Sequence, residues 1–178
     1  MRLAEIEIIS GEYHTITSDS KMVDELPARF SKLRGLLKPA FKIDNYDVVV
    51  SIQHKKRDYF IVAYGKPIGL AQIDPYWIDF IDGRTTHYIP SLFILPDYRR
   101  QRIAKRFYEH LIEGGMIIMA NQQTIDAKNL WKSFLGQFRL LRWDENKNYE
   151  WKSIPVTNIV EFDAAYDDRF TKLSVDKG

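Results

Sequence analysis

The residues best suited to hold a ligand are three arginines that follow an apolar run. The stretch from Phe93 to Leu95 is typical of a buried strand end, and Pro96-Asp97-Tyr98-Arg99-Arg100-Gln101-Arg102 then reads as a turn. We expect an amphipathic helix over residues 100–113, with arginines in its first turn. A helix N-terminus presents free backbone N–H groups and favours anions, whereas cations there oppose the helix dipole. The sequence therefore predicts a site for a polyanion such as a pyrophosphate.

Two other interpretations of the arginines stay open. They can be the solvated start of a helix, or Arg99 to Arg106 can form a nucleic-acid-binding surface. The 178 residues include 26 basic and 24 acidic side chains, for a formal net charge of +2. This balance does not by itself indicate nucleic acid as the partner.

The composition indicates an ordinary globular protein. The chain has no cysteine, which excludes disulfides and a cysteine nucleophile. His14, His54 and His110 show no metal-ligand spacing, so we expect no metal site. The segment from Met1 to Glu7 carries acids, unlike a signal peptide, and no apolar run approaches the roughly 20 residues of a membrane span. We therefore expect a cytoplasmic protein that does not associate with membranes.

Helical and strand-like patterns alternate along the chain. A first helix, with Asp24 as a possible cap, is expected to carry Met22, Leu26, Phe30, Leu33 and Leu37 on one face. Further helices are predicted over residues 100–113 and 125–134. Strands are predicted over residues 3–9, 46–53, 59–64, 67–73, 86–95, 116–120, 138–143 and 149–154.

These elements predict a mixed α/β fold. The central sheet is expected to be mostly antiparallel and flanked by helices, with one parallel strand–helix–strand crossover around residues 93–120. Gly65-Lys66 is a hairpin signal, and Pro90 should bulge its strand or face a gap because proline cannot donate to a sheet. We expect one domain over residues 1–162, followed by a polar C-terminal tail over residues 163–178.

This pattern resembles the GNAT superfamily of acyl-CoA-dependent N-acyltransferases. The family pattern is a strand, then Pro-x-Tyr-Arg, then Arg/Gln-x-x-Gly-x-Gly/Ala at the start of a helix. Here Pro96-Asp97-Tyr98-Arg99 matches the first motif, and Arg99 and Ala104 match the second. Gly65-Lys66-Pro67-Ile68-Gly69 is similar to a family hairpin, and Ala127-Lys128-Asn129-Leu130-Trp131 with Gly136-Gln137-Phe138 is similar to a later helix and closing strand. The resemblance covers about residues 59–143 and indicates a divergent member, of a kind that phage and other mobile genomes also encode.

The resemblance implies an N-acetyltransferase with acetyl-CoA as co-substrate and a primary amine, on a small molecule or a protein, as acceptor. The cofactor would enter a gap between the strands at residues 92–95 and 116–120, with its pyrophosphate on the N–H groups of residues 100–104. The residues implied in cofactor binding are Phe93, Ile94, Leu95, Arg99, Arg100, Gln101, Arg102, Ile103, Ala104 and Asn121, with Gln122 as an alternative to Asn121. A homodimer is a further possibility.

A general base would help the acceptor amine to attack. The strand before the arginine turn offers His87, Tyr88 and Ser91 but no carboxylate. His87 has a suitable ordinary pKa and is the candidate catalytic residue, with a structural role in the core as the alternative.

Two residues depart from the family pattern. Arg102 replaces a glycine, which the fold accommodates if this position is helical. Trp131 stands where many members have a tyrosine that protonates the leaving thiolate, and an indole N–H cannot serve as that acid. A competing hypothesis is therefore a catalytically weak or inactive protein that keeps the fold as a structural or protein-binding module.

Overall fold

The computed structural model describes residues 19–53, 56–75, 85–119, 125–145, 151–167 and 172–178. The predicted strand over residues 3–9 lies outside the described residues. In chain order the elements are α1 (Asp19–Leu33), the 3₁₀ helix η2 (Arg34–Leu36), β1 (Lys38–Ile43), β2 (Tyr46–Gln53), β3 (Lys56–Ala63), β4 (Lys66–Pro75), β5 (Thr86–Ile94), the 3₁₀ helix η3 (Pro96–Tyr98), α2 (Ile103–Glu113), β6 (Ile117–Met119), α3 (Ile125–Lys132), β7 (Arg139–Glu145), β8 (Trp151–Pro155), α4 (Ile159–Asp167) and β9 (Lys172–Asp176).

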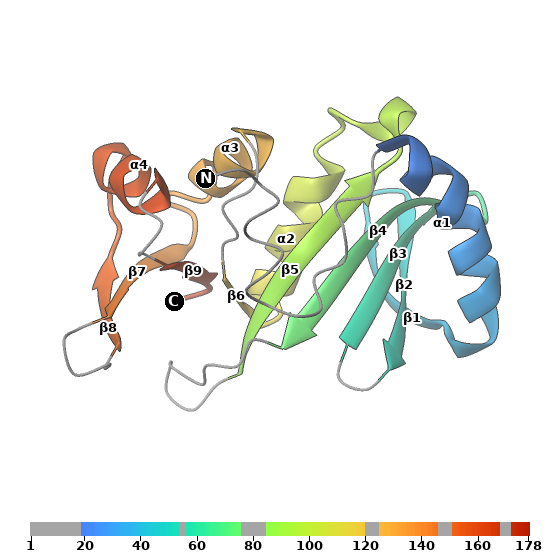
Figure 1. Ribbon diagram of the computed structural model, residues 1–178, viewed down its shortest axis with the longest axis horizontal. Coiled ribbons are helices and arrows are strands. Elements are labelled where there is room, and N and C mark those ends of the chain that lie inside the picture. Colours follow the sequence, from blue (N-terminus) through green and yellow to red (C-terminus); the bar gives the residue numbers. More distant parts are fainter. Residues whose placement is uncertain (1–18, 54–55, 76–84, 120–124, 146–150, 168–171) are drawn as a thin grey trace.

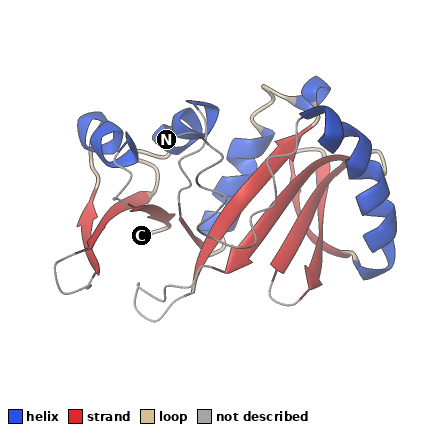
Figure 2. Cartoon of the chain, viewed as in Figure 1, coloured by secondary structure: helices blue, strands red, loops and turns tan. Residues whose placement is uncertain are grey.

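One mixed sheet runs through the whole molecule (Figure 2). Within the described ranges it has nine strands in the order β1-β2-β3-β4-β5-β6-β9-β7-β8. Figure 1 shows β1 to β5 on one side of the molecule and β7 to β9 on the other. Neighbouring strands are antiparallel except β5 and β6, which are parallel and connected through α2. The predicted mixed α/β fold with one parallel crossover is therefore confirmed.

The helices cover the two faces of the sheet in separate cores. Ile103, Phe107 and Leu111 recur at helical spacing on α2 and pack into the larger core, together with Trp131 of α3 and Phe162 of α4. On the opposite face, α1 packs Leu26 and Leu33 against Phe60, Val62 and Leu70 of β3 and β4. The strand residues alternate between these two cores, as expected for a sheet that is buried on both faces.

A two-residue turn joins β3 and β4 and confirms the predicted hairpin, although the turn is Tyr64-Gly65 and not Gly65-Lys66, since Lys66 already belongs to β4. Tyr64 and Gly65 have positive φ angles of 50° and 76°, the backbone that a type I′ turn requires at both central residues. Tyr64 is 99% exposed, so the turn itself needs no side-chain packing.

The strand β5 contains the bulge predicted from Pro90. Its register with β4 runs regularly from Ile94 to Ser91, opposite Gly69 to Gln72. The next pair is Asp74 with Tyr88, so β5 advances three residues while β4 advances two. The extra residue lies within Ile89-Pro90, where the proline could not have donated a ladder hydrogen bond.

The boundaries of two helices differ from the predictions. The helix α1 begins at Asp19, so Asp24 is not its cap and Pro27 lies in its interior on an exposed side. The helix α2 begins at Ile103 and not at Arg100, because Arg100 and Arg102 have positive φ angles of 63° and 58° that interrupt a right-handed helix.

The predicted division at residue 162 does not match a boundary in the sheet. Residues 159–167 form α4, and β9 lies between β6 and β7 with residues 173–176 buried. The polar residues of β9 are buried because they are paired: Trp143 Nε1 donates to Ser174 Oγ at 2.8 Å, and Arg139 Nε and Nη2 donate to the Asp176 carboxylate at 2.8 and 2.6 Å. The segment expected as a peripheral tail is thus a central strand.

We predict that Leu173→Ala lowers the free energy of unfolding by about 2–4 kcal/mol, because Leu173 is 2% exposed and its loss leaves a cavity. Lys177→Ala, at an exposed position of the same segment, should change it by no more than about 0.5 kcal/mol. Urea unfolding of both variants measures the difference. Equal stabilities would contradict the placement of β9 in the core.

Candidate functional site

The candidate site begins where the described pairing of β5 with β6 ends. Among the described residues the two strands pair through Thr86, His87 and Tyr88 of β5, opposite Ile117 to Met119 of β6. Beyond Tyr88, β5 continues to Ile94 and has no strand partner on that side within the described part of the chain. The bulge at Ile89-Pro90 directly follows the last described pair, and a bulge bends its strand and increases its twist. We refer to this edge of β5, unpaired among the described residues, as the gap.

The register shows which backbone groups of β5 face the gap. Leu95 N–H donates to the Ile68 carbonyl at 2.8 Å, so Leu95 points its backbone groups toward β4. In an antiparallel pair these directions alternate along the strand. Phe93 therefore also points toward β4, whereas Leu92 and Ile94 point into the gap. Of the three predicted residues Phe93, Ile94 and Leu95, only Ile94 points its backbone into the gap. Leu92 does so as well, and only the register with β4 reveals this.

Gly69 allows β4 to approach this part of β5 closely. A Cβ atom at Gly69 would lie 2.9 Å from the Phe93 carbonyl oxygen and 2.7 Å from Ile94 Cδ1, both too short for a real contact. The missing side chain at Gly69, the last residue of the Gly65–Gly69 motif, therefore allows β4 to hold β5 in this position.

The turn after β5 leaves a row of free backbone donors. Tyr98 N–H donates to Leu95 O at 2.9 Å, and Arg99 N–H donates to Pro96 O at 3.1 Å. The next backbone donor with an acceptor in the described part of the chain is Arg106 N–H, which donates to Arg102 O at 3.0 Å. The N–H groups of residues 100–105 have no such acceptor. Six consecutive free donors at the start of an 11-residue helix form a cradle for an anion.

The cradle depends on two arginines in a glycine-like conformation. Arg100 and Arg102 have φ angles of 63° and 58°, in the left-handed region. The expectation that Arg102 is helical is therefore wrong: it adopts a left-handed backbone, which glycine adopts without strain. This conformation costs an arginine roughly 1–2 kcal/mol, and it turns successive N–H groups toward a common point.

The arginine side chains divide into two roles. Arg99 Nε donates to the Ile94 carbonyl at 2.9 Å, and its guanidinium carbon lies 5.7 Å from the centre of the Phe93 ring. Arg99 therefore holds the turn against β5. Arg100 and Arg102 are exposed and form no ion pair with any residue that the structure describes. Their charges remain available to an anion in the cradle.

The turn between β1 and β2 supports the cradle from outside. Tyr46 Oη donates to Gln101 Oε1 at 2.7 Å, and Gln101 Nε2 donates to Asp97 O at 3.4 Å. Arg106 and Asp44 form an ion pair at 3.0 Å. Gln101 is thus held by neighbours, whereas the buried Ile103 anchors the first turn of α2 in the core.

His87 lies at the narrow end of the gap, on the paired part of β5. Its Nδ1 is buried and has no hydrogen-bond partner among the described residues. Burial lowers the pKa of His87 below its ordinary value of 6.5, and the charge of Arg57 acts in the same direction. The backbone at Ile117 and Thr85 opposes this shift without making an ordinary hydrogen bond to Nδ1. At neutral pH the imidazole is therefore uncharged and able to accept a proton.

Trp131 is a core residue. It is 3% exposed and packs edge-on against Tyr108 of α2 and against Phe134, with ring centres 6.5 and 6.2 Å apart. Burial raises the pKa of Tyr108 well above its ordinary value, and the nearby Tyr166 and Tyr88 add to this effect. The raised pKa makes the Tyr108 phenol a weaker acid than an ordinary tyrosine, and an indole N–H such as that of Trp131 is not an acid at all.

The remaining predicted cofactor residues are Ala104 and Asn121. Ala104 contributes one of the six free N–H groups of the cradle. Asn121 and its alternative Gln122 lie outside the described residues. No helix in the described part of the chain combines the length and apolar character needed to cross a bilayer.

The sequence of residues 22–121 matches the acetyltransferase (GNAT) family. This match spans more than half of the chain, so the protein belongs to the GNAT family. Members of the family are N-acetyltransferases with acetyl-CoA as co-substrate, and this chain is one of them. A comparison with curated proteins gave no match.

Several solved structures are similar in fold at low sequence identity. The ribosomal-protein-S18-alanine N-acetyltransferase from Escherichia coli is 16% identical, with a TM-score of 0.38 over 76% of this chain and 90% of that one. Arabidopsis thaliana NAA60 in complex with acetyl-CoA is 13% identical, with a TM-score of 0.41 over 85% and 92% of the two chains. The Bacillus subtilis N-acetyltransferase YlbP in complex with coenzyme A is 14% identical, with a TM-score of 0.39 over 83% and 93%.

We predict that Arg102→Gly stabilises the protein by about 0.5–1 kcal/mol, because glycine adopts the left-handed backbone without strain. Lys105→Gly, inside α2, should instead destabilise it by about 1 kcal/mol. Urea unfolding compares the two variants. A loss of stability in Arg102→Gly would show that the arginine is not strained at this position.

A second prediction concerns the pH dependence of stability. Because the pKa of His87 is lower in the folded protein, the unfolded chain binds more protons between that lowered pKa and 6.5. The free energy of unfolding is therefore unaffected by His87 above pH 6.5 and decreases as the pH falls through this window. The melting temperature of His87→Gln should therefore fall less than that of the wild type when the pH is lowered from about 7.5 to 5. Parallel losses in both proteins would contradict the shift.

Proposed function

We propose that this protein transfers the acetyl group of acetyl-CoA to a primary amine by direct attack of the amine on the thioester. The observation that carries the proposal is that the edge of β5 left unpaired among the described residues leads directly into the unpaired N–H groups of residues 100–105. A long ligand with an anionic end and a polar arm fits this arrangement, because the cradle offers donors to phosphate and the strand edge offers backbone groups to amides.

The donor is proposed to lie along β5. Its pyrophosphate occupies the N–H groups of residues 100–105, with Arg100 and Arg102 adding charge. Its pantetheine arm pairs with the backbone of Leu92 and the N–H of Ile94, and the thioester lies near the bulge at Ile89-Pro90. We propose one acyl-CoA-binding domain that includes β9, since β9 pairs with β6 beside the gap.

The reaction needs a free amine and a leaving thiol. The amine nitrogen attacks the thioester carbonyl carbon, the carbon–sulfur bond then breaks, and the thiolate takes up a proton as the nitrogen loses one. His87, uncharged at neutral pH and next to the last paired residue of β5, is the proposed acceptor of the amine proton. The site would contribute chiefly by orienting the amine and by aiming backbone donors at the carbonyl oxygen.

The second candidate function is binding without efficient transfer. It is favoured by Trp131, which is buried among aromatic rings and cannot act as an acid toward the thiolate. In that case the fold would serve as a structural or protein-binding module that still holds the cofactor. The cytoplasmic location and the homodimer stay predictions.

We predict that saturating acetyl-CoA raises the melting temperature by about 5 °C or more, as expected for a ligand at roughly 100 times its Kd. The double variant Arg100→Glu with Arg102→Glu should abolish this shift, because it reverses the charges beside the cradle. Lys38→Glu with Lys177→Glu changes the net charge equally at exposed positions away from the cradle and should keep the shift. Absence of a shift in the wild type at millimolar acetyl-CoA would refute the cofactor site.

Release of free thiol in the presence of a panel of amines separates the two functions. Acetyl-CoA binding with amine-dependent thiol release supports transfer. Binding without release for small amines and for peptide N-termini alike supports the second candidate. Strongly salt-dependent binding of DNA that the double variant loses would instead favour a nucleic-acid surface at the arginines.

A further inference from the structure

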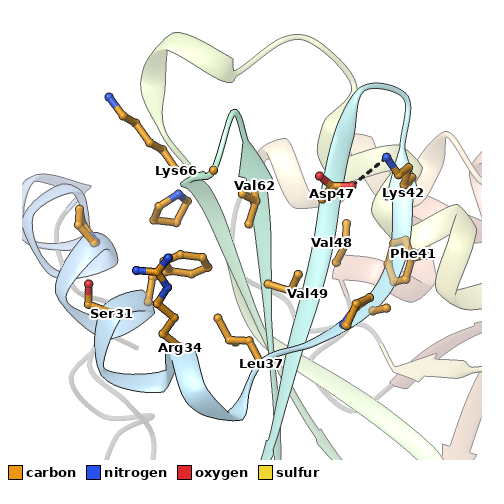
Figure 3. Close-up of a pocket in the computed structure, with 16 residues that line it drawn as sticks. Ser31, Arg34, Leu37, Phe41, Lys42, Asp47, Val48, Val49, Val62 and Lys66 are labelled. Atoms are coloured by element: carbon orange, nitrogen blue, oxygen red, sulfur yellow. Dashed lines mark ion pairs between the residues drawn. The ribbon is translucent and has the colours of Figure 1, made fainter.

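A groove of about 780 Å³ lies on the face of the sheet that α1 covers in part. Figure 3 shows it between α1 and η2 on one side and the hairpin of β1 and β2 on the other, with the β3–β4 turn at one end. The helix packs against β3 and β4, so the same face of β1 and β2 is left beyond its reach. This uneven cover accounts for the groove.

The floor of the groove is apolar. Val49 of β2 and Val62 of β3 form its base, and Phe30 and Leu37 line the wall made by α1 and the residue after η2. Each of these side chains also contacts the smaller core, so the floor is continuous with well-packed structure. The volume and the apolar lining with few polar groups are typical of a small-molecule site.

The rim of the groove is cationic. Arg34, Lys42 and Lys66 come from three different elements, and Asp47 is the one acid among the lining residues. Lys42 pairs with Asp47 at 3.0 Å. Arg34 and Lys66 form no ion pair with any described residue, so their charges are uncompensated by the part of the chain that the structure describes.

The groove is separate from the proposed acyl-CoA site. Its floor residues Val49 and Val62 point to the α1 face, whereas α2 and α3 flank the gap on the opposite face. No residue of the 100–105 cradle lines it. A ligand in the groove would therefore not compete directly with acetyl-CoA.

We propose that the groove binds a small amphipathic carboxylate. The apolar body of the ligand lies on Val49, Val62 and Phe30, its carboxylate contacts Arg34, and Lys66 adds positive charge farther along the rim. An arginine guanidinium matches a carboxylate with two parallel hydrogen bonds, and the neighbouring lysine adds a point charge. An apolar neutral molecule would lack the rim contacts, and an apolar cation would be repelled by them.

Decanoate is the test ligand, with decanol and decylammonium as neutral and cationic analogues of the same chain length. Calorimetry with the full-length protein should show decanoate binding roughly tenfold or more tightly than either analogue. Arg34→Glu with Lys66→Glu should weaken decanoate binding by about the same factor, and both side chains are exposed, so the fold should persist. In NMR spectra, the methyl groups of Val49 and Val62 should shift on titration with decanoate.

The charge-matched variant Lys38→Glu with Lys177→Glu should bind decanoate as the wild type does, since neither lysine lines the groove. Equal affinity for decanoate and decylammonium, or an equal loss of affinity in both double variants, would overturn the proposal. So would methyl shifts confined to residues outside the groove. The acetyl-CoA thermal shift should persist in Arg34→Glu with Lys66→Glu, which keeps this test independent of the proposed transferase activity.

Discussion

The edge of β5 beyond Tyr88, unpaired among the described residues, is the constraint on which the rest of the site depends. Two parallel strands that paired along their full length would use up the backbone groups of β5 on both sides. Here the described pairing ends at Tyr88, and the extra residue in Ile89-Pro90 bends the strand at that point. The backbone of Leu92 and the N–H of Ile94 consequently have no strand partner among the described residues, while the Ile94 carbonyl accepts from Arg99. The same strand then leads directly into the turn that carries the free N–H groups.

The anion cradle is maintained against local backbone preference. Arg100 and Arg102 are both held at positive φ, where glycine would be less strained. The surroundings account for this: Arg99 binds the Ile94 carbonyl on one side of the turn, and Tyr46 fixes Gln101 on the other. A strained backbone persists where neighbouring contacts determine it, and such positions are common at ligand sites.

The parts of the fold that could be predicted from the sequence are those whose signal is local. The core face of α2, the hairpin between β3 and β4 and the bulge at Pro90 follow from spacing, turn chemistry and the missing proline donor, although the turn lies one residue before the predicted Gly65-Lys66. The strand β9 could not be recognised in this way, because Ser174 and Asp176 read as surface residues. Their partners Trp143 and Arg139 are more than 30 residues away in the chain. Likewise, Leu92 and Ile94 could be told apart from Phe93 and Leu95 only once the register with β4 was known.

The position of β9 also bears on the order in which the protein folds. The strand β6 pairs with β5 on one side and with β9 on the other, through Ile118 with Val175 and Met119 with Ser174. These contacts close a long loop, whose entropy must be lost before the pairing can compensate for it. The hairpins of β1 to β4, by contrast, form from neighbouring segments. The pairing of β6, the parallel neighbour of β5, with β9 is therefore more costly in loop entropy than the local hairpins of β1 to β4.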